Sequence, residues 1–141
     1  MLVVIIVVLF FVSCSRDPEQ LQYGKDACHT CKMTLMDKKF GAELVTSKGK
    51  VYKFDDMNCM LNFINSGYLE GEQLQYKLVI DYTQPGKFVS AENAFYLKSD
   101  EIRSPMASGV AAFESEKVMY KYKLKLKAID MTWGELNTQL K

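Results

Sequence analysis

The sequence has almost no net charge and only one histidine. Lys and Arg total 18 and Asp and Glu total 17, which gives a formal net charge of +1, and the two signs are interspersed along the chain. Nucleic-acid-binding proteins usually present an excess or a stripe of positive charge, so we predict no nucleic-acid partner. His29 is the single histidine, so no other base is matched to a nucleophile, and an enzyme is the weaker functional class.

The sequence also lacks an apolar run long enough to cross a bilayer as a helix, which takes roughly 20 residues. Its apolar stretch, Leu2–Val12, has the length of the hydrophobic core of a secretory signal peptide. Cys14 follows at once behind the small Ser13, as in the lipobox of bacterial lipoproteins, where this cysteine is lipidated and becomes the mature N-terminus. An ordinary cleaved signal with an incidental cysteine is the alternative interpretation.

These features predict how the chain is organised and where it resides. The polar stretch that follows Cys14 is typical of a tether that lets a domain stand off a membrane. We therefore expect an exported, membrane-anchored lipoprotein on the periplasmic side of a bacterial membrane. Its parts are a signal peptide over residues 1–14, a flexible tether over 15–26 and one domain over 27–141.

The cysteines are too few for a disulfide framework. Apart from Cys14, three thiols remain, at Cys28, Cys31 and Cys59. An odd number of thiols in an exported protein indicates that at least one of them is held reduced or bound to something else.

Two of these thiols belong to the most informative motif of the chain, Cys28-His29-Thr30-Cys31-Lys32-Met33. Thiolate and thioether sulfurs are soft donors that favour Cu(I). A structural zinc site would normally recruit a second Cys or His pair and would have no use for a methionine. The motif therefore predicts a bound Cu(I) ion, about one per chain.

Two other uses of the motif stay open. Cys28 and Cys31 have the spacing of a thiol-disulfide oxidoreductase, although the long helix that follows such a motif in the thioredoxin fold is missing from the pattern. The cysteines could also form a structural zinc or sulfur site. The Cys-x-x-Cys-His signature of covalent haem attachment is absent, because Lys32 follows Cys31.

The body of the chain alternates between strand and helix patterns. Its first half predicts strands over 40–46 and 51–54 around a hairpin turn, a helix over 57–64 capped by Asp55 or Asp56, and a strand over 78–80. The second half repeats this plan, with a strand near 87–89, a segment around 91–97, a strand near 109–113, a helix over 114–122, a strand over 128–131 and a short helix after Thr132. The fold class we predict is α+β, a single domain built from two ββαβ-like halves.

A series of short motifs follows the lipobox. In chain order they are Cys28-x-x-Cys31-x-Met33, Phe54-Asp55-Asp56 with Cys59, Val79-Ile80-Asp81-Tyr82, Ala91-Glu92-Asn93-Ala94, Ser104-Pro105-Met106 with Gly109, and Ala112-Phe113. This ordered set resembles the NosL family. Lys32 departs from the family pattern, in which many members have glycine.

The resemblance implies a fold and a function. The fold would consist of two ββα-type halves related to the organomercurial lyase. The function would be that of a Cu(I)-binding lipoprotein that acts as a copper chaperone in the maturation of nitrous oxide reductase. Its partners would be that reductase or its assembly machinery, and the membrane through the lipid on Cys14.

The resemblance and the motif together give a ranking of copper ligands. We place Cys31 and Met33 first, Met106 next as a ligand from the second half, and Cys28 after it. Pro105 would help to aim the Met106 thioether by restricting the backbone before it. His29 is a further candidate, as a ligand or as a cation that stabilises neighbouring thiolates.

The remaining sulfur-containing and acidic residues are expected to have structural roles. Cys59 is interpreted as a buried small hydrophobe, with a fourth ligand as the alternative. Asp55 and Asp56 are interpreted as helix caps, with the orientation of a ligand as the alternative. Core positions are expected for Met36, Met57, Met60 and Met119.

Overall fold

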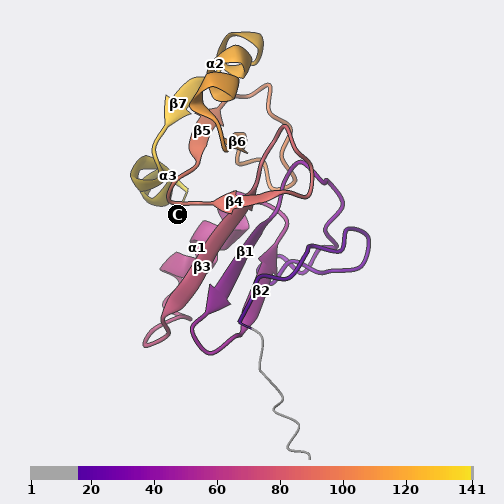
Figure 1. Cartoon of the computed structure of the whole chain (residues 1–141), viewed down its shortest axis with the longest axis vertical. Coiled ribbons are helices and arrows are strands. Elements are labelled where there is room, and N and C mark those ends of the chain that lie inside the picture. Colours follow the sequence, from indigo (N-terminus) through magenta and orange to yellow (C-terminus); the bar gives the residue numbers. More distant parts are fainter. Residues whose placement is uncertain (1–15, 141) are drawn as a thin grey trace, which may run out of the picture.

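The computed structural model describes residues 16–140, which form two halves arranged one above the other along the longest axis of the molecule (Figure 1). Each half contains an antiparallel sheet and a helix that packs against it. The predicted signal peptide, including Cys14, lies outside the described residues.

The first half is a four-stranded sheet with one helix. The sheet order is β2-β1-β3-β4, and every neighbouring pair is antiparallel. Its elements are β1 (Ala42–Thr46), β2 (Val51–Phe54), α1 (Met57–Asn65), β3 (Leu74–Ile80) and β4 (Phe88–Ser90).

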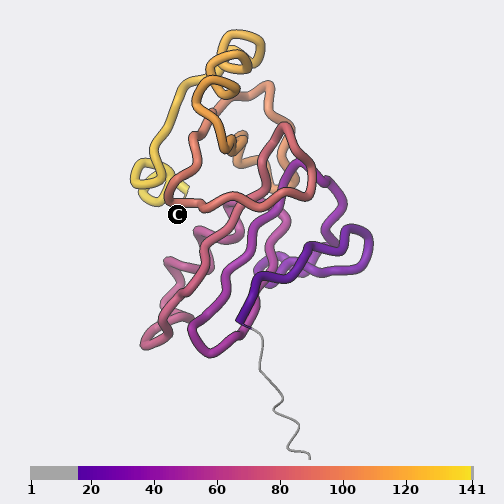
Figure 2. Tube along the Cα trace, in the orientation of Figure 1, coloured from indigo at the N-terminus to yellow at the C-terminus, as the bar shows by residue number. Residues whose placement is uncertain are grey.

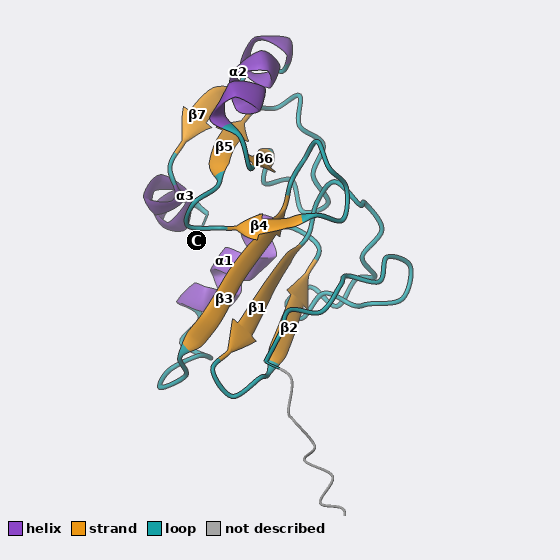
Figure 3. Cartoon of the chain, in the orientation of Figure 1, coloured by secondary structure: helices purple, strands orange, loops and turns teal. Residues whose placement is uncertain are grey.

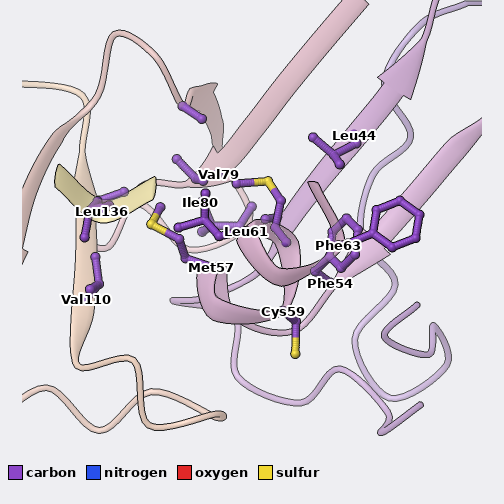
Figure 4. Close-up of a cluster of buried hydrophobic side chains, with 14 of the residues drawn as sticks. Leu44, Phe54, Met57, Cys59, Leu61, Phe63, Val79, Ile80, Val110 and Leu136 are labelled. Carbon is purple, nitrogen blue, oxygen red and sulfur yellow. The ribbon is translucent and has the colours of Figure 1, made fainter. Parts of the chain in front are cut away.

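Helix α1 forms where its cap and its apolar spacing predict it. The side chain of Asp56 accepts a hydrogen bond from the backbone N–H of Asn58, which satisfies one of the free donors of the first turn. The apolar face of α1 is buried and packs onto the sheet, where Met57, Leu61 and Phe63 meet side chains from β1, β2 and β3 (Figure 4). The helix ends just before Gly67, whose φ of 79° suits the reversal that follows.

The second half repeats the connectivity of the first. Its sheet order, β6-β5-β7, corresponds to β2-β1-β3, and in both halves a helix connects the second strand to the third. The prediction of two ββαβ halves is therefore confirmed. The elements are β5 (Phe95–Lys98), β6 (Val110–Phe113), α2 (Glu116–Lys125), β7 (Ile129–Met131) and α3 (Trp133–Gln139), with the predicted capping box formed by Thr132 and Glu135.

Several boundaries, such as those of β1 and α2, differ slightly from the sequence prediction, and two differences are larger. Strand β3 begins at Leu74, four residues before the predicted start, because pairing with β1 extends through the polar residues that interrupt its apolar pattern. The strand predicted near 87–89 is β4, and it pairs with β3 in the first sheet rather than opening the second half. Sequence periodicity identifies a strand but does not name its neighbour.

The N-terminal segment, residues 16–26, runs as loop along the first half (Figures 2 and 3). Leu21 is buried, and the backbone N–H of Glu19 donates to a carboxylate oxygen of Glu43 on β1, at 2.8 Å. Lys53 on β2 forms ion pairs with Glu19 and Asp26, both at 3.0 Å. Residues 19–26 therefore lie against the domain in this structure, where the sequence led us to expect a flexible tether.

Candidate metal centre

The Cys-x-x-Cys motif lies in a tight loop, residues 27–34, which we call the metal loop. Ala27 and Thr34 form an antiparallel bridge, and the N–H of Cys28 donates to the carbonyl of Met33 at 2.8 Å. The N–H of Lys32 donates to the carbonyl of Cys28 at 3.0 Å, and Lys32 itself has a φ of 65°. This left-handed conformation favours glycine, so the lysine adopts it at a cost in backbone strain.

The metal loop brings its two thiols to the start of α1. The Sγ atoms of Cys28, Cys31 and Cys59 and a carboxylate oxygen of Asp55 all lie within 4.8 Å of one another. The three cysteines are free thiols. Cys28, Cys59 and Asp55 are buried, whereas Cys31 is partly exposed, so the group has one open edge. We call these four residues the thiol cluster.

The start of α1 and the residue just before its N-cap supply the other half of the thiol cluster. Asp55 directly precedes the N-cap residue, and Cys59 lies in the first turn, where it points away from the other labelled core residues (Figure 4). The hydroxyl of Thr30 donates to the carbonyl of Cys59 at 3.0 Å, which ties the metal loop to the helix. The positive end of a helix dipole stabilises thiolates, so this location favours ionised cysteine.

The three thiols divide into one easily ionised group and two that hold their protons. A hydrogen bond from the Cys59 thiol lowers the pKa of Cys28 to about 6, against the opposing effect of burial and with the help of the backbone N–H groups of Cys31 and Asp55. Burial raises the pKa of Cys31 to about 11. The pKa of Cys59 is also raised, because its proton is shared with Cys28 and because it is buried. Cys28 is therefore the first of the three thiols to ionise.

Asp55 gives the cluster an unsatisfied acceptor. Its Oδ2 accepts a hydrogen bond from the Cys31 thiol at 3.4 Å. Its Oδ1 is buried and accepts no hydrogen bond from any described residue. A buried carboxylate oxygen without a donor is costly, and a cation nearby would relieve that cost. The donor set and this oxygen together fit a metal ion.

The two methionines ranked as ligands lie in different environments. Met33 is 56% exposed, at the outer end of the metal loop. Met106 is half-buried against the larger core cluster, which contains residues of both halves, and its N–H donates to Asp56 at 2.8 Å. Among the methionines expected in the core, Met57, Met60 and Met119 are buried, but the prediction for Met36 was wrong, since this side chain is 71% exposed.

His29 lies outside the thiol cluster. Its ring packs edge-on against Tyr52, Phe63 and Tyr68, with centroid distances of 4.8, 5.0 and 6.0 Å. Its backbone N–H donates to the carbonyl of Lys53 at 2.7 Å. Burial, and then the charges of Lys32 and Lys50, lower the pKa of the imidazole. This arrangement makes His29 an aromatic packing residue beside the centre.

Sequence reasoning underrated Cys59 and Asp55. Both residues were given structural roles, yet the structure brings both to the two motif thiols. The available signal was their spacing from the helix start, because a cysteine three residues after the N-cap and a carboxylate just before it belong to the same helix end.

The comparisons with known proteins agree with this picture. The sequence matches the NosL family over residues 20–128. The chain belongs to the NosL family. Among solved structures it is similar to the crystal structure of the copper chaperone NosL from Shewanella denitrificans, with a TM-score of 0.71 and 18% sequence identity, over 86% of this chain and 96% of that chain. At this identity the likeness shows a shared fold. No curated protein matches the sequence.

The NosL match includes all four residues of the thiol cluster, together with Met33 and Met106. It ends before β7 and α3, which belong to the part of the second half nearest the C-terminus. None of the helices among residues 16–140 has both the length and the apolar character needed to cross a bilayer.

Proposed function

We propose that this member of the NosL family is a Cu(I) carrier rather than an enzyme. The observation that supports this proposal is the gathering of three free thiols within 4.8 Å, closed on the inside by Cys28 and Cys59 and open at Cys31. Several soft sulfur donors hold Cu(I) tightly. A partly exposed ligand at the edge lets an acceptor protein take the ion by exchanging one sulfur at a time.

Copper is the ion that such a protein carries, and the residues of the centre have different roles in binding and releasing it. Cys28, with its lowered pKa, is ready to bind the ion as a thiolate. Cys31 and Cys59 release their protons as metal binds, since ligating thiols must be deprotonated. Met33, on the exposed side of the metal loop, suits the hand-over step because a thioether binds Cu(I) without any proton exchange.

This division changes the ranking that the sequence suggested. The motif and the family resemblance placed Cys31 before Cys28. We now propose Cys28 as the anchoring thiolate, because it is fully buried and its pKa is the one that is lowered.

The cellular setting is proposed from the sequence. A lipid on Cys14 would hold the protein at the periplasmic side of a bacterial membrane. The family resemblance suggests that the acceptor is nitrous oxide reductase or its assembly machinery, in the maturation of the copper centres of that enzyme.

Cu(I) competition tests the proposal. The chain from Ser15 onward, reduced and handled without oxygen, should bind about one Cu(I) per chain and prefer it strongly to Zn(II), because thioether and thiolate sulfurs are soft. Titration against a Cu(I) chelator and metal analysis measure the number of Cu(I) ions bound per chain and the preference for Cu(I) over Zn(II). Equal or tighter retention of zinc would overturn the copper assignment and favour a structural zinc site, for which three cysteines and an aspartate are an acceptable ligand set.

A thiol-disulfide oxidoreductase is the second candidate, favoured by the lowered pKa of Cys28. The burial of Cys28 argues against it, since an attacking thiolate must reach a disulfide substrate. Disulfide reduction by the metal-free protein, lost in both Cys28→Ser and Cys31→Ser, would establish the enzyme instead.

A further inference from the structure

Asp56 connects the two halves of the molecule next to the thiol cluster. This carboxylate is 1% exposed, and both of its oxygens are used. Oδ1 accepts the N–H of Asn58 in the first turn of α1 at 3.2 Å. Oδ2 accepts the N–H of Met106, fifty residues away in the second half, at 2.8 Å. One side chain therefore caps the helix and holds the Met106 backbone.

The neighbouring carboxylate, Asp55, accepts a hydrogen bond from a thiol of the cluster in the same way as Asp56 accepts one from the Met106 backbone. Asp55 accepts a hydrogen bond from Cys31 at 3.4 Å, and Asp56 accepts one from Met106. The Cα atoms of consecutive residues are about 3.8 Å apart, so Cys31 and Met106 are held by adjacent points at the start of α1. The Cys31 thiol from the metal loop and the Met106 backbone from the second half are in this way held at the same helix end.

Met106 sits in a turn that is stiffened by its own hydrogen bonds. The hydroxyls of Ser104 and Ser108 lie 3.0 Å apart, and the Ser104 hydroxyl also accepts the N–H of Gly109 at 3.1 Å. The N–H of Ala107, whose φ is 54°, donates to the carbonyl of Ser104 at 3.1 Å. A stiff turn moves as a unit, so the bond to Asp56, together with the packing of the Met106 side chain on the core shared by both halves, holds this turn against the start of α1.

We propose that Asp56 is a positioning residue for copper, which places the Met106 thioether against the thiol cluster through the hydrogen bond to the Met106 N–H. The proposal rests on the proposed function and on Met106 being a copper ligand, as the motif and the family resemblance predict. Through this bond, the copper affinity of thiols in the first half depends on a turn in the second half.

Asparagine at position 56 separates this task from helix capping. Asparagine caps helices about as well as aspartate, so Asp56→Asn keeps the bond to Asn58. Its amide has only one acceptor oxygen and would present an NH₂ group to the Met106 N–H, so the bond between the halves is lost. Asp56→Ser, also a good cap without a second acceptor, provides a second variant should the first fail to fold.

Asp81 is a matched control. It is 2% exposed, and it too joins distant backbone groups, with Oδ1 accepting the N–H of Thr83 at 2.7 Å and Oδ2 accepting the N–H of Glu114 at 2.8 Å. None of these partners belongs to the thiol cluster. Asp81→Asn therefore removes a comparable structural bond without touching the metal centre.

The test is a double-mutant cycle on the full chain, reduced and metal-free, titrated with Cu(I) against a chelator. Asp56→Asn should weaken Cu(I) binding roughly tenfold, the usual lower limit for losing a residue that orients a metal ligand. Met106→Leu should weaken it to a similar degree, and the double variant should be no weaker than Met106→Leu alone, because both changes remove the same sulfur. Asp81→Asn should leave the affinity within about twofold.

A second readout follows the sulfur itself. X-ray absorption of the copper-loaded protein should show one sulfur neighbour fewer in Asp56→Asn and in Met106→Leu, and no change in Asp81→Asn. The inference is overturned if Asp56→Asn binds copper like the wild type, or if the two effects add in full. If the wild type binds no Cu(I), the proposed function fails together with the inference, whereas an unaffected Asp56→Asn beside a copper-binding wild type removes the inference alone.

Discussion

Two of the three thiols in the metal centre are enclosed by protein, and the third keeps contact with solvent. Cys28 and Cys59 are 0% and 2% exposed, and Cys31 is partly exposed. Copper bound by all three would be held from the inside and approached from the side of Cys31 and Met33. An acceptor can then displace the outer ligands first, which allows tight binding and transfer in one site.

Removal of the Cys59 sulfur tests the inner side of this arrangement. We expect Cys59→Ala to weaken Cu(I) binding by roughly tenfold or more, about 1.4 kcal/mol, because a ligand is lost. The pKa of Cys28 should also rise in the metal-free variant, since the hydrogen bond from Cys59 is the main cause of its lowering. Chelator titration measures the first effect, and thiol absorbance as a function of pH measures the second.

Met60→Leu is the matched control for Cys59→Ala. Met60 is the next residue of α1 and is fully buried in the apolar core. The exchange conserves volume and should cost less than about 1.5 kcal/mol of stability without changing copper affinity. Equal Cu(I) affinities for Cys59→Ala, Met60→Leu and the wild type would mean that Cys59 is only a small buried hydrophobic residue and not a copper ligand.

At the level of single residues, the sequence predicted part of the metal centre. Cys28 and Cys31 could be paired in advance because they belong to one loop, and the chemistry of sulfur then pointed to copper. Cys59 and Asp55 could not be added, because a cysteine on an amphipathic helix and a carboxylate before a helix both have common structural explanations. The metal loop folds onto the start of α1, and this proximity, which the sequence does not show, is what assigns the two residues to the metal centre.

Among the elements, β2 holds both the metal loop and the N-terminal segment. The Lys53 ammonium pairs with Glu19 and Asp26, and the Lys53 carbonyl accepts the N–H of His29. The N-terminal segment also packs on Gly41, where an added Cβ would lie 2.6 Å from Leu21 Cδ1 and 3.2 Å from the Tyr23 hydroxyl. Close approach at this glycine lets the segment lie flat on the sheet.

Gly41→Ala should therefore loosen the N-terminal segment. Gly41 has a φ of 127°, which other residues rarely adopt, and its new methyl group would collide with Leu21. We expect a loss of about 1–3 kcal/mol in the free energy of unfolding, as is usual for overpacking, and faster tryptic cleavage after Lys25. Urea unfolding and timed proteolysis measure the two effects.

Gly71→Ala separates the collision from the backbone strain. Gly71 has a φ of 78°, and nothing lies within 4 Å of the position of an added Cβ. This variant should lose about 1 kcal/mol through strain alone and keep the wild-type rate of cleavage after Lys25. Equal cleavage rates in both variants would contradict the packing that we describe for Gly41.

The elements themselves were largely predictable, and the errors have a common cause. Helix α1 and strands β1 and β2 follow from local patterns, because each has a cap, a turn or an alternation of its own. Strand β4 was assigned to the wrong half, and β3 was predicted too short. In both cases the deciding contact is a pairing partner far away in the chain, which local periodicity does not contain.

In the whole molecule, two halves of the same connectivity contribute differently to the centre. The first half supplies the thiol cluster. The second half contacts the adjacent helix start through the hydrogen bond from the Met106 N–H to Asp56, fifty residues away. The repeat was visible in the sequence because strand and helix patterns recur in the same order. The contacts between the halves were not visible, because packing in a shared core and hydrogen bonds such as those from the Met106 N–H to Asp56 and from the Glu114 N–H to Asp81 leave no periodic pattern in the sequence.

A buried acidic side chain lies on β1, an inner strand of the first sheet. Glu43 is fully buried, and its Oε2 accepts no hydrogen bond from any described residue. Burial raises the pKa of Glu43 to about 7, and the carboxylates of Glu19 and Asp26 add to the rise, while the Glu19 N–H and Lys53 oppose it. The folded protein therefore favours the protonated form of Glu43 more than the unfolded chain does.

The sign of the effect on stability follows from proton binding. Between pH 4.5 and pH 7 the folded state retains a proton on Glu43 that the unfolded chain has released, so the contribution of Glu43 to stability falls as pH rises. This contribution is fully present below the pKa of Glu43 in the unfolded chain, and it is lost once the pH exceeds the pKa of Glu43 in the folded protein. Its upper limit is about 3 kcal/mol. Cys28 and His29 also change their ionisation in this range, so the wild-type profile alone cannot isolate Glu43.

The difference in stability between Glu43→Gln and the wild type isolates this effect, because glutamine keeps the shape of the side chain and an acceptor for the Glu19 N–H but does not titrate. We expect Glu43→Gln to gain stability relative to the wild type as pH rises from 5 to 8, by about 1–3 kcal/mol across the range. Urea unfolding of the metal-free proteins at four pH values measures the difference, with Glu70→Gln, at an exposed position, as the control that should show no trend. A constant difference between Glu43→Gln and the wild type would mean that Glu43 ionises normally beneath the N-terminal segment, and that the segment covers the sheet less closely than its contacts with Glu43 and Lys53 indicate.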